Sequence, residues 1–213
     1  LILGLCFLLA LGGVISAVAG FHQFWKEGAI GLGSAVLGAL LSLLVLSPYA
    51  FSGYRAAVHP QLTDVATDVW HPPLFQNAGA LRRPPMNPLG LQPPDQREQV
   101  LQAYPELVGR RYERPQETVL ETVLRLIDDR RWDVIGVVRS GEPTEGVTVE
   151  ALARTYLLGF PNDVAIRVED RGGATFVDMR SASRYGRHDL GDNAMRIRRF
   201  LTDLDDRMKV LPR

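Results

Sequence analysis

The stretch that decides the fold is LILGLCFLLALGGVISAVAGFHQFWKEGAIGLGSAVLGALLSLLVLSPYA, residues 1–50. It holds two charged residues, Lys26 and Glu27, which stand side by side between two apolar runs. The runs, 1–20 and 29–48, each have about 20 residues, the length with which an α-helix crosses a hydrocarbon core of roughly 30 Å. Lipid offers no partners to backbone amides, so each run should be helical. We therefore predict a transmembrane helical hairpin over residues 1–50, embedded in a lipid bilayer.

The link between the two runs, FHQFWKEG at 21–28, combines aromatic residues with a lysine, as interfacial anchors do. A cleaved signal peptide is the competing interpretation of the first run. It is disfavoured because no basic segment precedes the run and a second full span follows it. The chain begins at Leu1, so we expect further residues upstream, with room for another span.

The composition bounds the class of protein. The 24 basic and 24 acidic residues cancel, so no bulk charge attracts nucleic acid, and we expect no nucleic-acid partner. The single cysteine, Cys6, lies in the first run, which leaves the rest of the chain without an internal disulfide or a cysteine metal site. The link carries one Lys and one Glu, so the rule that positive charge stays inside does not decide the orientation.

A proline-rich segment follows the hairpin. Eight prolines lie between Pro60 and Pro94, and proline removes amide donors and breaks helices. We expect an extended tether over 51–94, without a packed core of its own but with room to lie over the domain, in which 62–68 has room for one short strand. The remaining residues, 95–213, are enough for one domain.

The pattern after residue 95 predicts an α+β domain. We expect a short helix at 95–103 with Asp95 as its N-cap, and an amphipathic helix that begins at Pro115. Four strands are expected at 132–139, 147–157, 163–169 and 175–180, with turn segments at 140–143, 159–162 and 171–173. A last helix should begin near Leu190, with Asp189 as its N-cap. Short links imply a four-stranded antiparallel sheet, and the simplest packing puts both long helices on one face.

The densest polar run, RSASRYGRHDLGDN at 180–193, is the candidate site. Arginines and a histidine that meet a helix N-terminus would favour an anion, a lipid headgroup or a partner protein. The candidate residues are Arg180, Ser183, Arg184, Arg187, His188 and Asn193. The alternative is a capped turn whose arginines pair with nearby carboxylates such as Asp178 and Asp192.

Other chemistry is weakly supported. His188, Asp189 and Ser183 invite comparison with a catalytic triad, but an adjacent His and Asp do not easily align as base and orienter. The four histidines are scattered, which argues against a metal site, and no glycine loop suggests a cofactor. The outer face of the sheet, with Arg154, Arg167, Asp178 and Arg180, is either a solvated face with cross-strand ion pairs or a docking surface.

Small residues recur every four positions in both apolar runs. One row is Gly12, Ser16 and Gly20, and the other is Gly31, Ala35 and Ala39. Such rows let helices approach closely. They serve either the packing of the two helices on each other or the docking of a partner's transmembrane helix.

Three segments resemble the DUF1499 family. They are DVATD with PPLF at 64–68 and 72–75, GFPNDVAIRV at 159–168, and VDMRSASR at 177–184 with GR, DLG and Asn193 after it. The hairpin resembles the N-terminal region of alphaproteobacterial members, some of which carry a further upstream span. The resemblance implies a protein of the bacterial inner membrane with a periplasmic domain. It transfers no catalytic residues and no cofactor. The proline-rich insert, about 78–94, is longer than the family pattern.

Together these features predict a non-enzymatic, multi-pass membrane protein that serves as an accessory or assembly subunit of a larger membrane complex. Its expected partners are the bilayer and other integral membrane proteins. The alternative is a periplasmic module that binds lipid headgroups or anions through the 180–193 run.

Overall fold

The computed structural model describes residues 2–28, 31–139, 146–155 and 158–210. The chain divides into two compact units, which we call the hairpin unit, up to Val58, and the sheet unit, from His59 onward. The predicted turn at 140–143 and the last two residues of the strand predicted at 147–157 lie outside the described residues.

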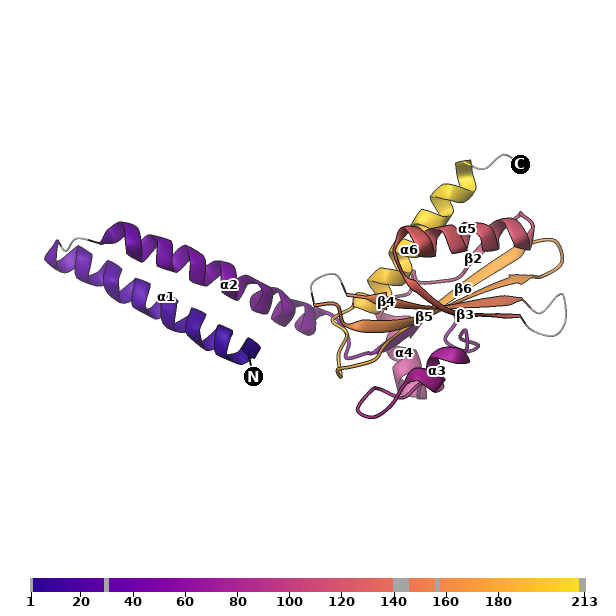
Figure 1. Cartoon of the computed structure of the whole chain (residues 1–213), viewed down its shortest axis with the longest axis horizontal. Coiled ribbons are helices and arrows are strands. Elements are labelled where there is room, and N and C mark those ends of the chain that lie inside the picture. Colours follow the sequence, from indigo (N-terminus) through magenta and orange to yellow (C-terminus); the bar gives the residue numbers. More distant parts are fainter. Residues whose placement is uncertain (1, 29–30, 140–145, 156–157, 211–213) are drawn as a thin grey trace. The chain divides into compact units, whose positions relative to one another are not determined.

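The hairpin unit consists of two long apolar helices, α1 (Ile2–Glu27) and α2 (Leu32–Val58), shown in Figure 1. Both are long and apolar enough to cross a membrane. The prediction of two apolar N-terminal helices is therefore confirmed. Helix α2 continues past the expected end at 48, with Pro48 inside it. Most large apolar side chains of both helices are exposed, as lipid-facing residues would be.

The two helices pack through small residues, on a row that is partly different from the predicted one. Ala10, Ala17 and Ser42 are the buried residues of the pair. A Cβ added to Gly13 would overlap the Ser42 hydroxyl, and one added to Gly20 would lie 3.6 Å from the Ala35 Cβ. The helices therefore approach most closely along Ala10, Gly13, Ala17 and Gly20, whereas a Cβ at Gly12 would meet open space.

The sheet unit is built on a six-stranded antiparallel sheet. Its strands are β1 (Asp64–Ala66), β2 (Arg110–Tyr112), β3 (Asp133–Arg139), β4 (Val147–Arg154), β5 (Pro161–Asp170) and β6 (Thr175–Ser183). The order is β1-β6-β5-β4-β3, and β2 also pairs with β6. The predicted meander is present as β3 to β6, but the predicted total of four strands is wrong. The strand suggested within 62–68 exists as β1, and β2 was missed because three residues carry no readable alternation.

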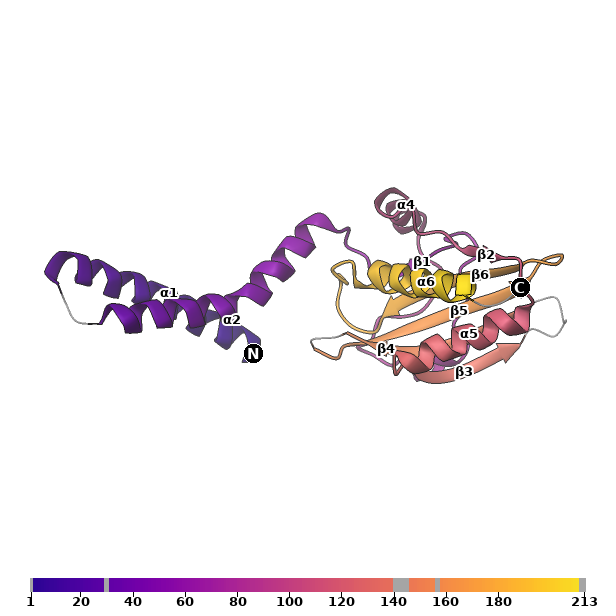
Figure 2. The same cartoon turned by 90° about the horizontal axis from the view of Figure 1, so that it is seen from above.

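Four helices complete the sheet unit: α3 (Asn77–Leu81), α4 (Pro94–Ala103), α5 (Gln116–Asp129) and α6 (Asp192–Val210). Figures 1 and 2 show α5 and α6 over one face of the sheet and α3 on the opposite side. The two long helices thus share a face. Helix α3 was not predicted, and α4 begins one residue before its predicted start. The sequence predicted α4 to within one residue, although Asp95 lies in its first turn and Pro93 is the N-cap.

The two faces of the sheet differ in chemistry. On β5, Val164, Ile166 and Val168 belong to the apolar core under α5 and α6. The alternate residues Asp163 and Arg167 point to the other face, because successive strand side chains alternate. That second face carries charge, yet it is largely covered by protein.

The cover is the proline-rich segment, which is not a free tether. Residues 51–58 belong to α2, and Leu62, Val65 and Val69 are buried in the core of the sheet unit. Residues 70–92, which we call the strap, run across the second face and contain α3. The expected extended tether over 51–94 is therefore corrected. Its prolines limit its helix and strand content, but its side chains and carbonyls find partners on the sheet.

Candidate functional site

Arg180 of β6 is the first of three charged anchors between the sheet and the strap. Its side chain is 2% exposed and pairs with Asp64 of β1, with Nη2 2.6 Å from Oδ2. Nη1 also donates to the Pro73 carbonyl at 3.4 Å, and Nη2 donates to the Gly90 carbonyl. The guanidinium lies 5.0 Å from the centre of the Phe75 ring. Arg180 therefore holds both ends of the strap to the centre of the sheet.

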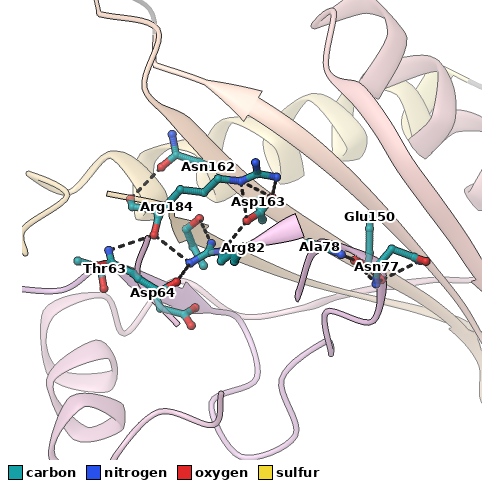
Figure 3. A network of polar contacts seen from close by, with 12 residues as sticks. Thr63, Asp64, Asn77, Ala78, Arg82, Glu150, Asn162, Asp163 and Arg184 are labelled. Carbon is teal, nitrogen blue, oxygen red and sulfur yellow. Dashed lines mark hydrogen bonds and ion pairs between the residues drawn. The ribbon is translucent and has the colours of Figure 1, made fainter. Parts of the chain in front are cut away.

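Asp163 of β5 is the second anchor, and two arginines converge on it (Figure 3). Its fully buried carboxylate accepts from Arg184 Nη2 at 2.7 Å and from Arg82 Nε at 2.7 Å. Arg82 comes from the strap and Arg184 from the end of β6. The remaining Arg82 donors reach the carbonyls of Asn87, Ser183 and Ala182. Burial lowers the pKa of Arg82, and the bond to Asp163 opposes that effect.

Glu150 of β4 is the third anchor, and no cation pairs with it among the described residues. Its buried carboxylate instead accepts the backbone amides that open α3: Gln76 at 2.8 Å, Asn77 at 3.0 Å and Ala78 at 2.7 Å. Figure 3 shows it against Asn77 and Ala78. A carboxylate at a helix N-terminus satisfies donors that the helix itself leaves open. Glu150 thus fixes the middle of the strap.

A fourth polar cluster lies on the helix-covered face, at the end of β6. Ser181 Oγ donates to Asn193 Oδ1 at 2.8 Å, and Asn193 Nδ2 donates to Ser183 Oγ at 3.0 Å. Ser183 in turn donates to Asn162 at 2.8 Å. Arg196 of α6 donates to Asn193 Oδ1 as well, and burial lowers its pKa. These groups connect the end of the sheet to the first turn of α6.

Asp189 binds the start of α6, although the helix begins at Asp192, so Asp189 lies two residues before the N-cap position that the sequence predicted for it. Its carboxylate accepts the amides of Gly191 at 2.8 Å and Asn193 at 3.0 Å. Burial raises the pKa of Asp189, and the two backbone hydrogen bonds oppose that rise. Leu190 and Gly191 both have positive φ, 56° and 76°. A side chain at 191 would also overlap the His59 ring, so glycine is required there on two counts.

The six candidate residues do not form one open cluster. Arg180, Ser183, Arg184 and Asn193 are buried, and each is bonded within the sheet unit. Arg187 is exposed, and His188 is half-buried with its Nδ1 accepting the Leu190 amide at 3.0 Å. The alternative of a capped turn describes this geometry better, although Arg180 pairs with Asp64, Arg184 pairs with Asp163, and Asp178 pairs with Arg167 of β5.

The triad suggested by Ser183, His188 and Asp189 is not assembled. The serine bonds to Asn162, the histidine to a backbone amide, and the aspartate to two other backbone amides. Across residues 2–28, 31–139, 146–155 and 158–210, no group of three His, Cys, Asp or Glu side chains has the geometry for a metal ion.

Sequence reasoning missed the partners of the arginines. Asp64 and Asp163 fall inside the quoted family motifs and on alternating positions of strands, so a reader who placed them on one face would have paired them with Arg180 and Arg184. Arg82 and Glu150 carried no such signal. They meet the sheet only because the strap folds back over it.

The two edges of the sheet differ in how far neighbouring elements cover them. On the β6 side, two short strands and α4 lie along the edge (Figure 2). On the other side, β3 pairs only with β4 among the described strands. Val134 and Val137 of β3 are about half exposed on the helix-covered face. At the Arg139 end of β3 lies a groove of about 170 Å³ between α5 and the sheet. Its lining residues are Arg139, Val147, Gln116, Glu117, Leu120, Glu121 and Leu124.

Comparison with known proteins gives a family. The chain is similar to a solved structure, CalU16 from Micromonospora echinospora, with 16% sequence identity, 45% of this chain and 72% of that chain covered, and a TM-score of 0.28. No curated protein matches the chain. The family model described as "Protein of unknown function (DUF1499)" matches residues 64–204, well over half of the chain and all three motif segments. The chain belongs to the DUF1499 family.

Proposed function

We propose that this protein is a non-enzymatic, membrane-anchored accessory or assembly subunit that docks on a larger membrane protein complex. Helices α1 and α2 would anchor it as a multi-pass protein of a bacterial inner membrane, with the sheet unit in the periplasm. The observation that carries the proposal is the open edge of β3 beside the groove under α5.

An open edge strand presents a row of unpaired backbone donors and acceptors, which a partner's extended segment satisfies by pairing with it. Proteins that do not use such an edge usually shorten or cover it, as happens here at the β6 side. β3 is seven residues long and has a register shift between Val134 and Gly136, which limits uncontrolled edge-to-edge association. The occupant we propose is an extended segment of the partner, with an apolar side chain in the groove and a basic residue near Glu117.

The interior of the sheet unit supports the same proposal. The charged groups that the sequence offered for chemistry, Arg180 and Arg184, neutralise Asp64 and Asp163 inside the protein. Buried ion pairs of this kind fix geometry and are not free to receive a ligand. The exposed valines of β3, Val134 and Val137, are therefore the stronger candidate for a working surface than the 180–193 run.

The test compares Val137→Lys with Leu101→Lys in affinity purification of the full-length protein from its own membranes in mild detergent. Both side chains are 46% exposed, and Leu101 lies on α4 near the other edge. We expect the wild type and Leu101→Lys to retain a stoichiometric integral membrane partner and Val137→Lys to lose it. Equal retention by both variants would contradict docking at β3.

The alternative function, a lipid-headgroup or anion-binding module, would have to work without the two buried arginines. Arg187 and His188 are the accessible members of that set. No observation favours an anion at these two residues alone, so the subunit proposal stands first.

A further inference from the structure

One end of the sheet unit gathers exposed apolar and aromatic side chains. Leu158 and Phe160 lie at the turn between β4 and β5, and Tyr185 lies just after β6. Phe160 is 50% exposed, and the other two are similarly accessible. Aromatic rings that are partly exposed to solvent are typical of residues that lie at a membrane–water interface.

Hydrogen bonds place these turns at the end where the chain enters the sheet unit. The Arg184 amide donates to the Pro161 carbonyl at 3.1 Å, which joins the two turns. The Asp189 amide donates to the Leu62 carbonyl at 2.8 Å. The His59 ring packs against Gly191 and lies 6.2 Å from the Tyr104 ring. His59, the first residue of the sheet unit, is therefore at the same end as Phe160 and Tyr185.

Three exposed arginines lie at this end, together with an exposed carboxylate, Asp133 at the start of β3, which is opposite Leu152 of β4. Arg83, Arg154 and Arg187 are exposed, and none of them takes part in an ion pair with another described residue. The carboxylates of the same segments, Asp163 and Asp189, are buried and already bonded. Arginine binds phosphate through two parallel hydrogen bonds, so three arginines beside aromatic rings suit a layer of anionic headgroups.

The covalent connection between α2 and the sheet unit limits which surface this end of the sheet unit can reach. The apolar part of α2 ends near Phe51, and the helix continues to Val58 without a break. Seven further residues at 1.5 Å each add at most about 10 Å, which is close to the thickness of the headgroup layer on one side of a bilayer. His59 follows Val58 directly in the chain as the first residue of the sheet unit.

We propose that this end of the sheet unit is a docking face for the anionic lipid surface of the bilayer that holds the hairpin. Leu158, Phe160 and Tyr185 enter the headgroup layer, and Arg83, Arg154 and Arg187 bind lipid phosphates. The contributions of apolar insertion and electrostatic attraction to the binding free energy then add, as in other interfacial segments. This inference rests on the proposed membrane anchoring, but not on the proposed partner at β3.

The test measures the depth of a nitroxide label on the full-length protein in phosphatidylcholine vesicles with and without phosphatidylglycerol. Cys6 is replaced by serine, and single cysteines are introduced by Phe160→Cys, Val210→Cys and Leu8→Cys. Val210 is 85% exposed at the far end of α6, so it reports a water-facing position. We expect the label at 160 to be severalfold less accessible to an aqueous quencher than the label at 210, most strongly with phosphatidylglycerol.

The outcomes separate this inference from the proposal on which it rests. A label at 8 in the hydrocarbon together with a label at 160 as accessible as at 210 would overturn the lipid-docking face alone. A water-accessible label at 8 would overturn the membrane anchoring and with it the inference. Charge reversal at Arg83, Arg154 and Arg187 in the Phe160→Cys protein should restore quencher access in phosphatidylglycerol vesicles. If it has no effect there, the basic residues do not bind the lipid.

Discussion

Arg184 and Arg187 are three positions apart and have opposite surroundings. Arg184 is buried against Asp163, whereas Arg187 is exposed. Because Arg184→Ala would leave a buried carboxylate with one partner fewer, we expect it to lower the free energy of unfolding by about 3 kcal/mol. Arg187→Ala should change it by less than about 0.5 kcal/mol. Urea unfolding of the two full-length variants in the same detergent measures both values.

The same pair of variants separates the structural role from anion recognition. If the 180–193 run were an anion site, Arg184→Ala would fold as the wild type does and lose binding to anionic vesicles. A normal unfolding curve for Arg184→Ala would therefore contradict the role that its buried contact with Asp163 assigns.

Asp189 should make stability depend on pH in the direction opposite to most acidic residues. Burial raises its pKa in the folded protein above the ordinary value. The folded state therefore binds the proton more tightly than the unfolded state does, and this contribution to stability is present at low pH and is lost as the pH rises through the raised pKa. Asparagine also caps helices and does not titrate.

The measurement is the difference in free energy of unfolding between the wild type and Asp189→Asn, from about pH 3 to about pH 7. We expect the wild type to lose stability relative to the variant as the pH rises. A difference that stays constant would show that the two backbone hydrogen bonds balance burial, and a difference that changes in the opposite direction would show that they outweigh it.

At the scale of single residues, local capping signals could be predicted from the sequence more readily than the ion-pair partners of the arginines. Asp189 was predicted as an N-cap because the signal is local, a short polar side chain ahead of an amphipathic run. The pairing of Arg180 with Asp64 spans 116 positions, and the alternation of the two strands shows only which face each residue occupies. Long-range ion pairs depend on the register of β1 on β6, which periodicity alone does not fix.

At the scale of the elements, the position of the strap depends more on its contacts with Glu150 of β4 than on its own sequence. Glu150→Gln removes the charge from three hydrogen bonds to the amides of Gln76, Asn77 and Ala78. Hydrogen bonds to charged groups are worth about 1.5–3 kcal/mol, so we expect α3 to open more often by roughly that free energy. Hydrogen exchange should become faster at 76–78 and stay unchanged in β5.

A matched control is Glu117→Gln, which neutralises an exposed glutamate on α5. It should leave the exchange of α3 as it is in the wild type. Equal protection of 76–78 in the wild type and Glu150→Gln would show that the strap is held by its other two anchors alone.

The hairpin offers a second matched pair of substitutions. A side chain at Gly13 would collide with Ser42 of α2, while Gly12 faces open space. Overpacking of this kind costs about 1–3 kcal/mol. Gly13→Leu should therefore lower the thermal stability of the helices in micelles, followed by circular dichroism, and Gly12→Leu should not. The reverse order would mean that the row predicted from Gly12, Ser16 and Gly20 is the true contact.

The elements show where sequence patterns carry information. Strands β3 to β6 and helices α5 and α6 were predicted because long amphipathic segments repeat their pattern several times. β2 and α3 have three and five residues, which are too few for a period. The strap was interpreted as part of an extended tether, with room to lie over the domain, because proline excludes regular structure. Proline does not prevent the side chains of such a tether from binding to a sheet.

At the scale of the whole molecule, the surfaces of the hairpin unit and the sheet unit suit different solvents. The hairpin exposes its apolar side chains, and the sheet unit buries its own in one core. The sequence predicted this division because charge disappears from residues 1–50 apart from Lys26 and Glu27. The docking edge that we propose could not be predicted from the sequence, since a strand is recognised as an edge only after the strands have been placed in order.

The most direct test of the subunit proposal is the native mass of the wild-type particle extracted from its own membranes in a mild detergent, with its components identified by mass spectrometry. The proposal predicts a particle that contains this 23.6 kDa chain and an integral membrane partner in fixed stoichiometry. Recovery of the chain alone, or only with copies of itself, would contradict it.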